Sequence, residues 1–574
     1  MNIYNFFLNS IITLVDKHKK KLNISNTNNF KNTTVENPPP NFDFDLSCNI
    51  ALILAKINNL NPQELAKNIK NILIDNTENI EKIEIAGPGF LNIKIKNDSI
   101  KILMEKIFLE QDSYGAKKEN KKYNIEFVSA NPTGPMHVGH CRGAIFGDVL
   151  SNLLVFNGNN VTKEYYINDY GNQIRNFSKS VFLRIREIIY GEKFVNDKDL
   201  YPGDYIIDIA KKIIKDNPNE KYENFDDSFK KLSTESLFYS MEMIKADLQQ
   251  LGIKHDNFIS ETELVAKNLV NKSIKHLKHN QFVEEGFLER PKGEESNNWK
   301  KTKRLIFKST IFKDDTDRAL TKNDGSWTYF ANDIAYHMDK VSRKYDYLIN
   351  ILGADHTGYV KRITAAVSAL SLDKIKLECK ICQLVKLYKK GKPFKMSKRA
   401  GDFISVNDLL KEVDKDSIRF MMLNRSNDVE LDFDFDKVLE KSKDNPVYYV
   451  QYCYARINSL FRSIDKKVND DLNLSNENFV LNSYEAKILR KIFEWPKVIN
   501  VASNKYEPHR IPFYLYELST LFHSYWSKGN ENEELRFIKD NKIKNNNSFA
   551  IIKLVALVIR NGMRILGVSL PSKM

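Results

Sequence analysis

Cysteine is scarce in this sequence of 574 residues. There are five cysteines, an odd number, and they are widely scattered. A disulfide framework is therefore not expected, and a reducing compartment is. Cys379 and Cys382 form a single CxxC, but no second pair or nearby histidine would complete a zinc site. We interpret both as core residues of a strand and expect no structural metal.

A hydrophobic run long enough to span a membrane is also missing. No stretch approaches the ~20 apolar residues that a spanning helix needs. Ile3–Val15 is partly apolar, but its charges follow it and no small-residue cleavage site appears. This pattern favours an amphipathic helix over a signal peptide. We therefore expect a cytoplasmic protein without a membrane partner.

The composition indicates a folded protein with several domains. Hydrophobic residues make up 42% and aromatic residues 11% of a chain too long for one core. Lys and Arg number 88 against 74 Asp and Glu, a formal net charge of +14. That surplus favours a polyanionic partner such as nucleic acid, although a generally lysine-rich proteome would also produce it.

One stretch predicts a strand, a tight turn and a helix. Tyr123–Val128 is apolar, β-branched and aromatic, as in a buried strand. Ser129–Pro135 contains two prolines and a glycine, which indicates a turn. From about Val138 the apolar spacing is helical, and Asn157-Gly158 supplies the stop. This is half of a nucleotide-binding βαβ unit, with anions expected at the helix start.

Two histidines stand at that helix start. His137 and His140 flank Val138 and Gly139. Imidazoles can donate to phosphate oxygens, and a glycine leaves room for a nucleotide on the backbone. The HVGH element alone is a weak signal, because two surface histidines would look the same. Far downstream, however, Lys395–Lys398 reads KMSK in a basic loop with glycines on both sides.

Polar clusters follow two further predicted strands. Val161–Ile167 leads into Asn168–Gln173, and Tyr347–Leu352 leads into Gly353–Gly358. Such runs at strand ends are where open parallel sheets bind ligands. Ile381–Tyr388 is predicted as the next strand, directly before the lysine loop.

The pattern divides the chain into three parts. Residues 1–115 are predicted to form an α+β domain, and residues 116–405 a core that carries a mostly helical insertion at about 190–300. Residues 406–574 are helical in pattern. In the last helix, apolar residues spaced 3-4-3-4-3 predict one continuous apolar face: Phe549, Ile552, Ala556, Ile559, Met563 and Leu566.

Aromatic, amide and basic residues lie among the apolar residues of two C-terminal helices. Such side chains can stack on unpaired bases. For any single one of them, core packing is the alternative. The candidates are Tyr448, Gln451, Tyr454, Arg456, Tyr514 and Trp526.

The HVGH and KMSK elements resemble the two signatures of the class I aminoacyl-tRNA synthetases. More narrowly, the whole chain resembles the bacterial arginyl-tRNA synthetases. The matching stretches are Glu126–Asp148, Ser326–Asp333, Gly353–Gly358, Phe394–Gly401, Asn445–Ile457 and Leu566–Met574. The segment 190–300 carries no motif that matches.

The resemblance implies a fold and a reaction. The fold is α/β: a Rossmann-type catalytic core with a parallel sheet, an N-terminal α+β domain that helps hold tRNA, and a C-terminal all-α anticodon-binding domain. The implied enzyme activates L-arginine with ATP, with Mg²⁺ as part of the ATP substrate complex. It then transfers arginine from the adenylate to the terminal ribose of tRNA(Arg). In the family, arginine activation waits for tRNA, and we expect a monomer.

The resemblance also assigns site residues. Arginine would contact Glu126, Asn131, Tyr329 and Asp333. ATP would contact His137, Gly139, His140, Gly353, Asp355, His356, Lys395, Met396, Ser397 and Lys398, of which both histidines and both lysines would be catalytic. The family's amide contact near Gly353 has no glutamine here, so Asp355 or His356 would replace it.

Residue chemistry supports an arginine pocket independently. A guanidinium is a planar cation with five donors and needs fixed carboxylates. Glu126 is the only acid in its strand, and a buried glutamate is costly without a cation. Asp333 stands at a turn into a helix, where a simple helix cap is the alternative.

Other functions fit the sequence less well. A small-molecule nucleotidyltransferase shares the histidine element but would not need the C-terminal third. A non-catalytic tRNA-binding relative would have lost the lysines or histidines. A cysteine-specific synthetase would show zinc ligands, and a glutamine-specific one would have little use for two carboxylates.

Overall fold

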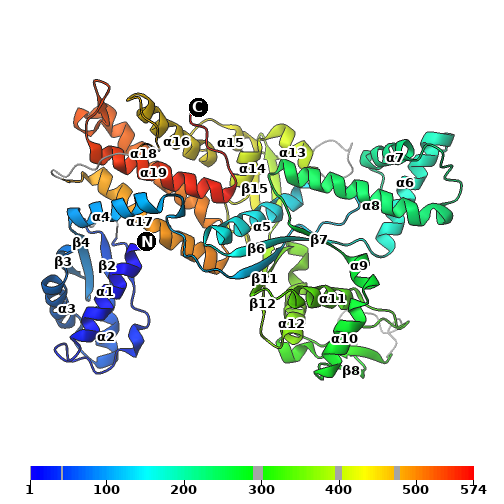
Figure 1. The fold of residues 1–574 in the computed structure, drawn as a ribbon, viewed down its shortest axis with the longest axis horizontal. Helices are drawn as coiled ribbons and strands as arrows, with labels where there is room; N and C mark the ends of the chain where they lie inside the picture. The colour runs from blue at the N-terminus through cyan, green and yellow to red at the C-terminus, as the bar shows by residue number, and fades with distance from the viewer. Residues whose placement is uncertain (1, 40–42, 289–301, 395–403, 469, 471–478) are drawn as a thin grey trace.

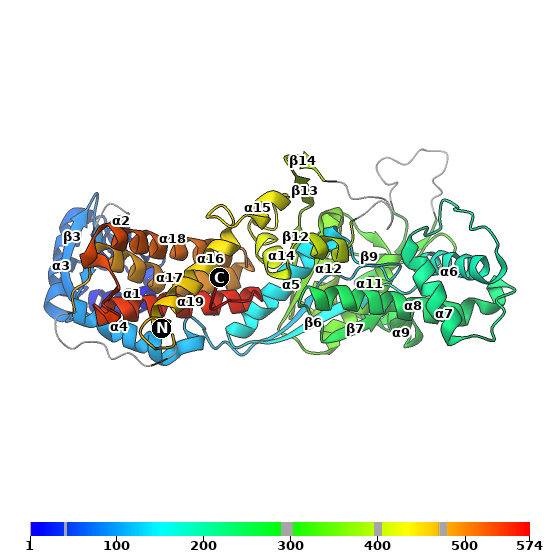
Figure 2. The ribbon, with the colours of Figure 1, turned by 90° about the horizontal axis from the view of Figure 1, so that it is seen from above.

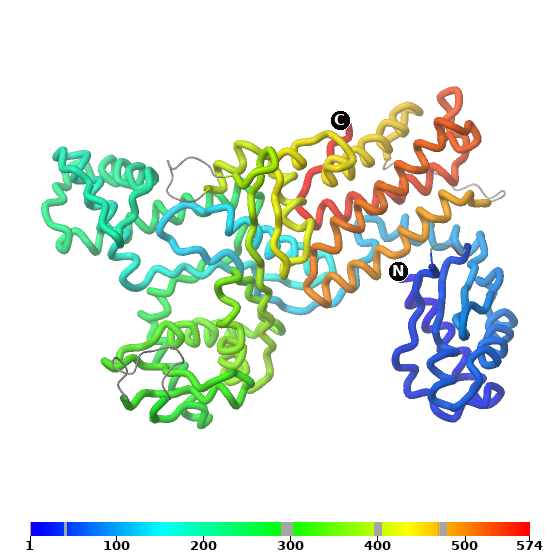
Figure 3. The backbone as a smooth tube through the Cα atoms, turned by 180° about the vertical axis from the view of Figure 1, so that it is seen from behind, coloured from blue at the N-terminus to red at the C-terminus, as the bar shows by residue number. Residues whose placement is uncertain are grey.

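The computed structural model describes residues 2–39, 43–288, 302–394, 404–468, 470 and 479–574. The predicted lysine loop, Lys395–Lys398, lies outside these residues. The molecule is elongated, and the C-terminal helices lie between the N-terminal domain and the parallel sheet (Figures 1 and 2). The N-terminal domain and three helices of the middle part, α10 (Leu269–His279), α11 (Tyr329–Ser342) and α12 (Val360–Ser371), extend to the same side of the molecule (Figure 3).

The N-terminal domain packs helices against a four-stranded antiparallel sheet of order β1-β2-β4-β3. Asn61 caps α3, and Pro62 stands in the first turn of that helix, where its missing N–H costs no hydrogen bond. The stretch Ile3–Val15 lies in a helix that ends at Lys17 and buries one apolar face, as an amphipathic helix does. The elements are α1 (Ile3–Lys17), β1 (Val35–Glu36), β2 (Leu46–Cys48), α2 (Ile50–Asn58), α3 (Pro62–Asn76), β3 (Ile80–Ala86), β4 (Phe90–Ile95) and α4 (Asn97–Glu110).

The central part of the chain is built on a five-stranded parallel sheet of order β12-β11-β5-β6-β7. The chain runs outward in one direction from β5 and in the other from β11, so the order reverses between these two neighbours. This switch point is where open parallel sheets bind ligands. The strands are β5 (Lys122–Glu126), β6 (Asn160–Ile167), β7 (Asn257–Ser260), β11 (Tyr347–Gly353) and β12 (Lys376–Cys382).

Helices cover both faces of the sheet. Phe127 packs against Gly147 of α5 (Val138–Phe156), whereas Glu126 contacts Lys340 of α11 (Tyr329–Ser342) on the other face. Helix α12 (Val360–Ser371) packs beside α11. The expected Rossmann-type class, with helices around a parallel sheet, is confirmed.

The predicted insertion at 190–300 is mostly helical over its described residues, 190–288, but it also supplies β7, the edge strand of the sheet. Helices α6 (Asn172–Tyr190), α7 (Asp204–Asp216) and α8 (Phe225–Gln250) form an arm at one end of the molecule (Figure 1). A smaller unit follows. Its elements are α9 (Glu261–Ala266), α10 (Leu269–His279), β8 (Val283–Gly286), β9 (Arg304–Phe307) and β10 (Arg318–Ala319).

One strand prediction is wrong. Ile381–Tyr388 is not continuous, because β12 ends at Cys382 and β13 (Val385–Lys389) joins a separate sheet of order β14-β13-β15. The backbone between them turns to Asn427, whose carbonyl accepts from Gln383 N. The new elements are β14 (Lys392–Pro393), α13 (Val406–Glu412), α14 (Lys415–Met421), β15 (Leu431–Asp434) and α15 (Phe435–Leu439).

The C-terminal part is a helical bundle with one short hairpin. The last helix is buried on nearly every side, including at Ile551, Val555 and Val558, rather than along one face only. Four helices, α5 and the three that precede it in the bundle, pack against it, so only a narrow polar stripe remains, formed by Lys553, Arg560 and Arg564. The elements are α16 (Pro446–Arg462), α17 (Ser483–Lys505), α18 (Arg510–Glu531), β16 (Ile538–Lys539), β17 (Lys542–Ile543) and α19 (Asn546–Leu566).

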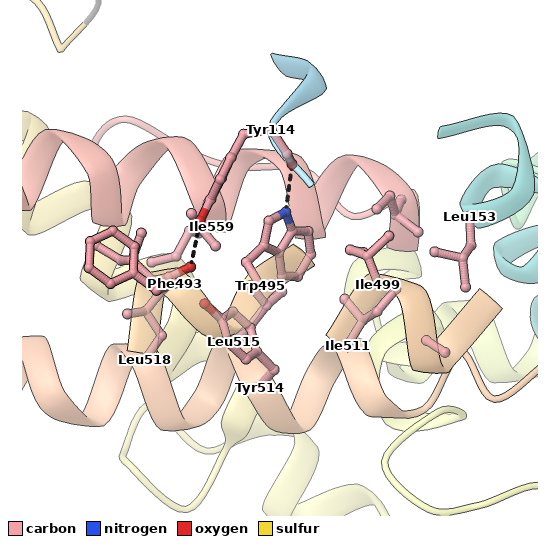
Figure 4. Close-up of a cluster of buried hydrophobic side chains, with 14 of the residues drawn as sticks. Tyr114, Leu153, Phe493, Trp495, Ile499, Ile511, Tyr514, Leu515, Leu518 and Ile559 are labelled. Carbon is pink, nitrogen blue, oxygen red and sulfur yellow. Dashed lines mark hydrogen bonds between the residues drawn. The ribbon is translucent and has the colours of Figure 1, made fainter. Parts of the chain in front are cut away.

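The linker after the N-terminal domain is fixed to this bundle. Trp495 Nε1 donates to Tyr114 O at 2.9 Å, and the Tyr114 hydroxyl donates to Ile492 O at 3.1 Å (Figure 4). Both side chains are buried among the apolar residues of α17 to α19. The N-terminal domain is therefore anchored to the bundle by a packed joint.

Candidate active site

The turn after β5 has a strained backbone. Val128 and Ser129 have φ of 70° and 40°, values that side chains other than glycine rarely adopt. Ser129 N donates to Phe127 O at 3.1 Å across a three-residue turn. The Ser129 hydroxyl donates to Glu126 Oε1 at 3.0 Å and accepts from Tyr166 N at 3.1 Å. These bonds hold a conformation that costs about 1–3 kcal/mol per strained residue.

His137 and His140 form the first turn of α5. His137 is the N-cap, and the two rings stack with centroids 3.7 Å apart. Gly139 N donates to His137 Nδ1 at 3.1 Å, and His137 N donates to His140 Nδ1 at 3.3 Å. Each Nδ1 is thus an acceptor, which places the proton of each neutral ring on Nε2.

Both imidazoles are neutral at physiological pH. Burial lowers the pKa of His137, and burial followed by the neighbouring ring lowers the pKa of His140 to about 3. A Cβ on Gly139 would lie 2.8 Å from His137 Cε1, so alanine there would displace the ring. The helix start therefore offers Nε2–H donors to an anion.

The segment that follows the lysine loop pairs with this element. Val138 N donates to Ile404 O at 2.9 Å, and Val406 N donates to Met136 O at 3.0 Å. Ile404 comes six residues after Lys398. The described chain therefore resumes beside the two histidines, whereas the predicted ATP contacts Lys395, Met396, Ser397 and Lys398 fall outside the described residues.

The remaining predicted ATP contacts, Gly353, Asp355 and His356, lie at the end of β11, the strand beside β5. β11 ends at Gly353, next to β5 in the sheet, and a Cβ there would lie 2.6 Å from Asp355 Oδ1. Asp355 Oδ2 and His356 Nε2 are 3.4 Å apart, and their side chains are 80% and 56% exposed. Both are open to solvent at the carboxyl edge of the sheet, beside the switch point.

A buried polar row runs across three strands. Asn350, Glu126 and Glu164 are in register on β11, β5 and β6. Lys340 Nζ, fully buried, lies 2.6 Å from Glu126 Oε2 and donates to Asn350 Oδ1 at 3.0 Å. The burial of Glu126 is thus balanced by a cation of the protein itself, a partner that the local sequence around Glu126 does not reveal.

The charge of the buried Glu164 is also balanced by basic side chains of the protein. Burial raises its pKa, but hydrogen bonds from Arg343 and the charge of Lys340 outweigh this effect and bring the pKa to about 2. Arg343 Nη2 donates to Glu164 Oε1 at 2.8 Å, and the Tyr336 hydroxyl donates to the same oxygen at 2.8 Å. The negative charges of Glu126 and Glu164 are therefore balanced beneath α11 by the positive charges of Lys340 and Arg343.

Asp333 and Glu261 stand beside this balanced row. Burial raises the pKa of Asp333 to about 7, with repulsion from Glu261 and Glu126 adding to the effect and a hydrogen bond from Tyr359 opposing it. Burial also raises the pKa of Glu261, which is 4% exposed and accepts from Asn332 Nδ2 at 2.8 Å. A buried carboxyl group that ionises with difficulty would be stabilised by an added cation.

Glu261 was missed by the sequence argument. It is the first residue of α9, a position where an acidic residue is ordinary. Its neighbours Tyr166 and Asn332 come from other strands and helices. No local sequence signal could have identified it.

The other two predicted arginine contacts lie apart from this cluster. Asn131 is exposed and accepts from Asn168 Nδ2 at 3.3 Å, at the carboxyl edge of β6. Tyr329 is 68% exposed, with Lys322 Nζ 5.6 Å from its ring centroid. The structure thus brings Glu126 and Asp333 together, places Asn131 along the same edge, and leaves Tyr329 at the surface.

The predicted base-stacking residues divide into two groups. Tyr514 is 2% exposed and its hydroxyl donates to Lys491 O, so core packing describes it better. Arg456 lies over the rings of Tyr452 and Trp526, at 4.2 and 5.2 Å from their centroids.

Tyr448, Gln451 and Tyr454 lie on the same helix, α16, and are partly exposed. Gln451 Nε2 donates to Ser569 O at 3.0 Å. The α16 surface therefore remains a candidate contact for RNA.

The described part of the chain contains neither a metal-binding cluster nor a membrane-spanning helix. No group of three or more His, Cys, Asp or Glu residues there could hold a metal ion. Burial raises the pKa of both Cys379 and Cys382 to about 12, which suits inert thiols within a strand. No helix among these residues is long and apolar enough to cross a membrane.

Comparison with known proteins identifies the class first. A model of the catalytic domain of class I (R) tRNA synthetases matches residues 103–461, well over half of the chain. Together with the parallel sheet and the two-histidine helix start, this match defines a class I aminoacyl-tRNA synthetase. Models of the arginyl-tRNA synthetase N-terminal domain and of the DALR anticodon-binding domain match residues 9–95 and 450–574.

The relatives narrow the class to one family. An arginine–tRNA ligase of Pelagibacter ubique is 54% identical over all of both chains, and one of Ruegeria pomeroyi is 42% identical over all of both. A solved Campylobacter jejuni protein assigned as an arginyl-tRNA synthetase is 31% identical. It has a TM-score of 0.73 and covers 84% of this chain and 100% of its own. The chain belongs to the arginyl-tRNA synthetase family.

Proposed function

We propose that this chain joins L-arginine to tRNA(Arg) in two steps. Arginine and ATP first give arginyl-adenylate and pyrophosphate, and the terminal ribose hydroxyl of tRNA then attacks the activated carbonyl. The observation that carries the proposal is the pair of hard-to-ionise acids, Asp333 and Glu261, at the same sheet edge as the neutral histidine pair. A guanidinium supplies the charge that these acids need, and the histidines supply donors for phosphate.

The arginine pocket in this proposal consists of Glu126, Asp333 and Glu261, with Asn131 toward the amino-acid end. Lys340 already neutralises Glu126, so the added cation is shared mainly by the other two acids. A planar guanidinium can bridge two carboxylates, whereas an ammonium cannot do so with the same geometry. Selection of arginine over lysine follows from that geometry.

The first step needs no protein nucleophile. The arginine carboxylate attacks the α-phosphorus, so the protein contributes positioning and charge stabilisation. His137 and His140 donate through Nε2–H to the phosphates, and Lys395 and Lys398 close over the outer phosphates with Mg²⁺ sharing their charge. Gly353, where β11 ends, and the exposed Asp355 lie under the adenosine in this proposal.

The second step needs a tRNA with its end in the core. We propose that residues 406–574 bind the anticodon region through the α16 surface, and that residues 1–115 hold the body of the tRNA. The reaction takes place in the cytoplasm with the chain as a monomer.

A charging assay with each of the twenty amino acids and total tRNA tests the function. We expect ester formation with arginine alone. Esterification of another amino acid in preference to arginine would overturn the proposal. Lys398→Ala should lower the turnover of ATP–pyrophosphate exchange by at least ~100-fold with little change in the arginine KM, and an unchanged exchange rate would remove Lys398 from the mechanism.

A further inference from the structure

The helical arm α6–α8 contacts the turn between β5 and α5, here called the catalytic turn, at two separate points. The arm has its own apolar core, in which α6, α7 and α8 pack together. Its buried members include Phe177, Val181, Ile185, Ile206, Ile209, Ile213 and Leu232. Because the arm folds around that core, its two contacts with the turn are not needed to complete it.

The first contact comes from α7. The Tyr205 hydroxyl donates to Thr133 O at 3.0 Å. Its ring lies so close to Gly134 that a Cβ there would be 2.9 Å from Tyr205 Cζ. The glycine of this turn thus makes room for a side chain of the arm.

The second contact comes from the far end of α8. Asp247 Oδ2 accepts from Met136 N at 2.9 Å, and both residues are buried, at 6% and 0% exposure. Met136 O accepts from Val406 N on the opposite side, so the peptide groups around Met136 are held from two directions. Figure 1 shows α8 running from the arm back toward α13, which carries Val406.

These contacts fix the direction of the peptide that leads into the histidines. Met136 directly precedes His137, whose N–H donates to His140 Nδ1 at 3.3 Å, near the upper limit for a hydrogen bond. A small rotation of this peptide would break that bond. The proton of His140 would then no longer be confined to Nε2.

We propose that Tyr205 and Asp247 are positioning residues: through them the helical arm holds residues 133–136 so that His137 and His140 keep their Nε2–H groups turned toward the ATP phosphates. The inference rests on the proposed function, because it assigns the arm a part in adenylate formation. It also assigns a role in catalysis to the segment 190–300, in which the sequence shows no motif of the family.

Substitutions in full-length protein, assayed by ATP–pyrophosphate exchange with arginine and total tRNA, test the proposal. Tyr205→Phe keeps the ring on Gly134 and loses only the bond to Thr133, so we expect kcat to fall roughly 3- to 10-fold. Asp247→Leu leaves the buried Met136 N–H without an acceptor, and kcat should fall roughly 10- to 100-fold. Asp247→Asn retains an acceptor and should stay within about 3-fold of the wild type. The arginine KM should change little in all three, since none contacts the acidic pocket.

Two control variants remove matched groups that act only within the arm. Tyr239→Phe removes a hydroxyl bonded to Asp216, and Asp226→Asn removes a carboxylate paired with Arg175. Both should leave kcat unchanged. A loss of exchange in the controls equal to that in the test variants would show general support of the fold and would overturn the proposal.

Histidine tautomers supply an independent readout. In protein labelled with ¹⁵N at histidine, the ring nitrogen shifts of His140 should report Nε2–H in the wild type and a tautomer mixture in Asp247→Leu. If Asp247→Leu fails to fold, Tyr205→Phe decides. Wild-type kcat and wild-type tautomers in Tyr205→Phe would overturn the inference, whereas an inactive wild-type protein would instead overturn the proposed function.

Discussion

Replacing Lys340 by methionine should destabilise the catalytic core more than any surface charge change. Lys340 Nζ is fully buried, 2.6 Å from Glu126 Oε2 and 3.0 Å from Asn350 Oδ1. Methionine keeps most of the volume of the stem but leaves Glu126 as a buried carboxylate without its cation. Removing one partner of a buried ion pair costs about 3–5 kcal/mol.

The stability lost in Lys340→Met depends on the burial of the ion pair and not on the presence of an ion pair alone. Lys267 and Glu263 are also paired, at 3.3 Å, but their side chains are 64% and 69% exposed. Solvent screens that pair, so Lys267→Met should cost no more than about 0.5 kcal/mol. This matched variant removes the same charge without the desolvation penalty.

Urea unfolding followed by circular dichroism compares the variants under one set of conditions. The double variant Lys340→Met with Glu126→Gln removes both charges, and it should recover most of the stability lost in Lys340→Met. If Lys340→Met loses no more stability than Lys267→Met, then Glu126 is not held as a buried anion and the account of the polar row fails.

Three further predictions concern the pocket and its support. Asp333→Asn removes a charged partner of the guanidinium, worth about 2–3 kcal/mol, and should raise the arginine KM of exchange roughly 30- to 150-fold with the ATP KM little changed; an unchanged arginine KM would exclude Asp333 from the pocket. Burial raises the pKa of Asp333 to about 7, so the ionised form that we propose as the arginine ligand is lost below that pH. The wild-type arginine KM should fall between pH 6 and pH 8 in exchange assays, and Asp333→Asn should flatten this trend. Gly147→Ala would place a Cβ 2.3 Å from Phe127 Cγ and should destabilise the core by about 1–3 kcal/mol in urea unfolding. Gly143→Ala, whose Cβ would meet only Ile351 at 4.0 Å, should not destabilise it.

The strand–turn–helix of the site could be predicted because its signals are local. The apolar strand, the turn with its prolines and the helix stop each occupy a few consecutive residues. The prediction of Tyr123–Val128 nevertheless extended beyond β5, which ends at Glu126. Val128 and Ser129 leave the strand because contacts with β6, such as that from Tyr166 N, stabilise a strained turn there.

The chemistry of Glu126 could be predicted only in part. The sequence indicated that a buried glutamate needs a cation, and this was correct. It could not indicate that Lys340, 214 residues away, is that cation. Lysines are numerous in this chain, and only the packing of α11 on the sheet selects one.

By itself the sequence determined which chemical groups this enzyme possesses: the paired histidines at a helix start, the lysine-rich loop, the acids of the first strand and of α11, and the order of three domains. Neighbouring residues encode these features, so no folding of distant parts was needed to see them. The tertiary structure alone decided which groups meet. It pairs Glu126 with Lys340, places Glu261 beside Asp333, and brings the helical arm into contact with the turn before α5. Contacts between distant residues depend on packing, and no short stretch of sequence specifies that packing.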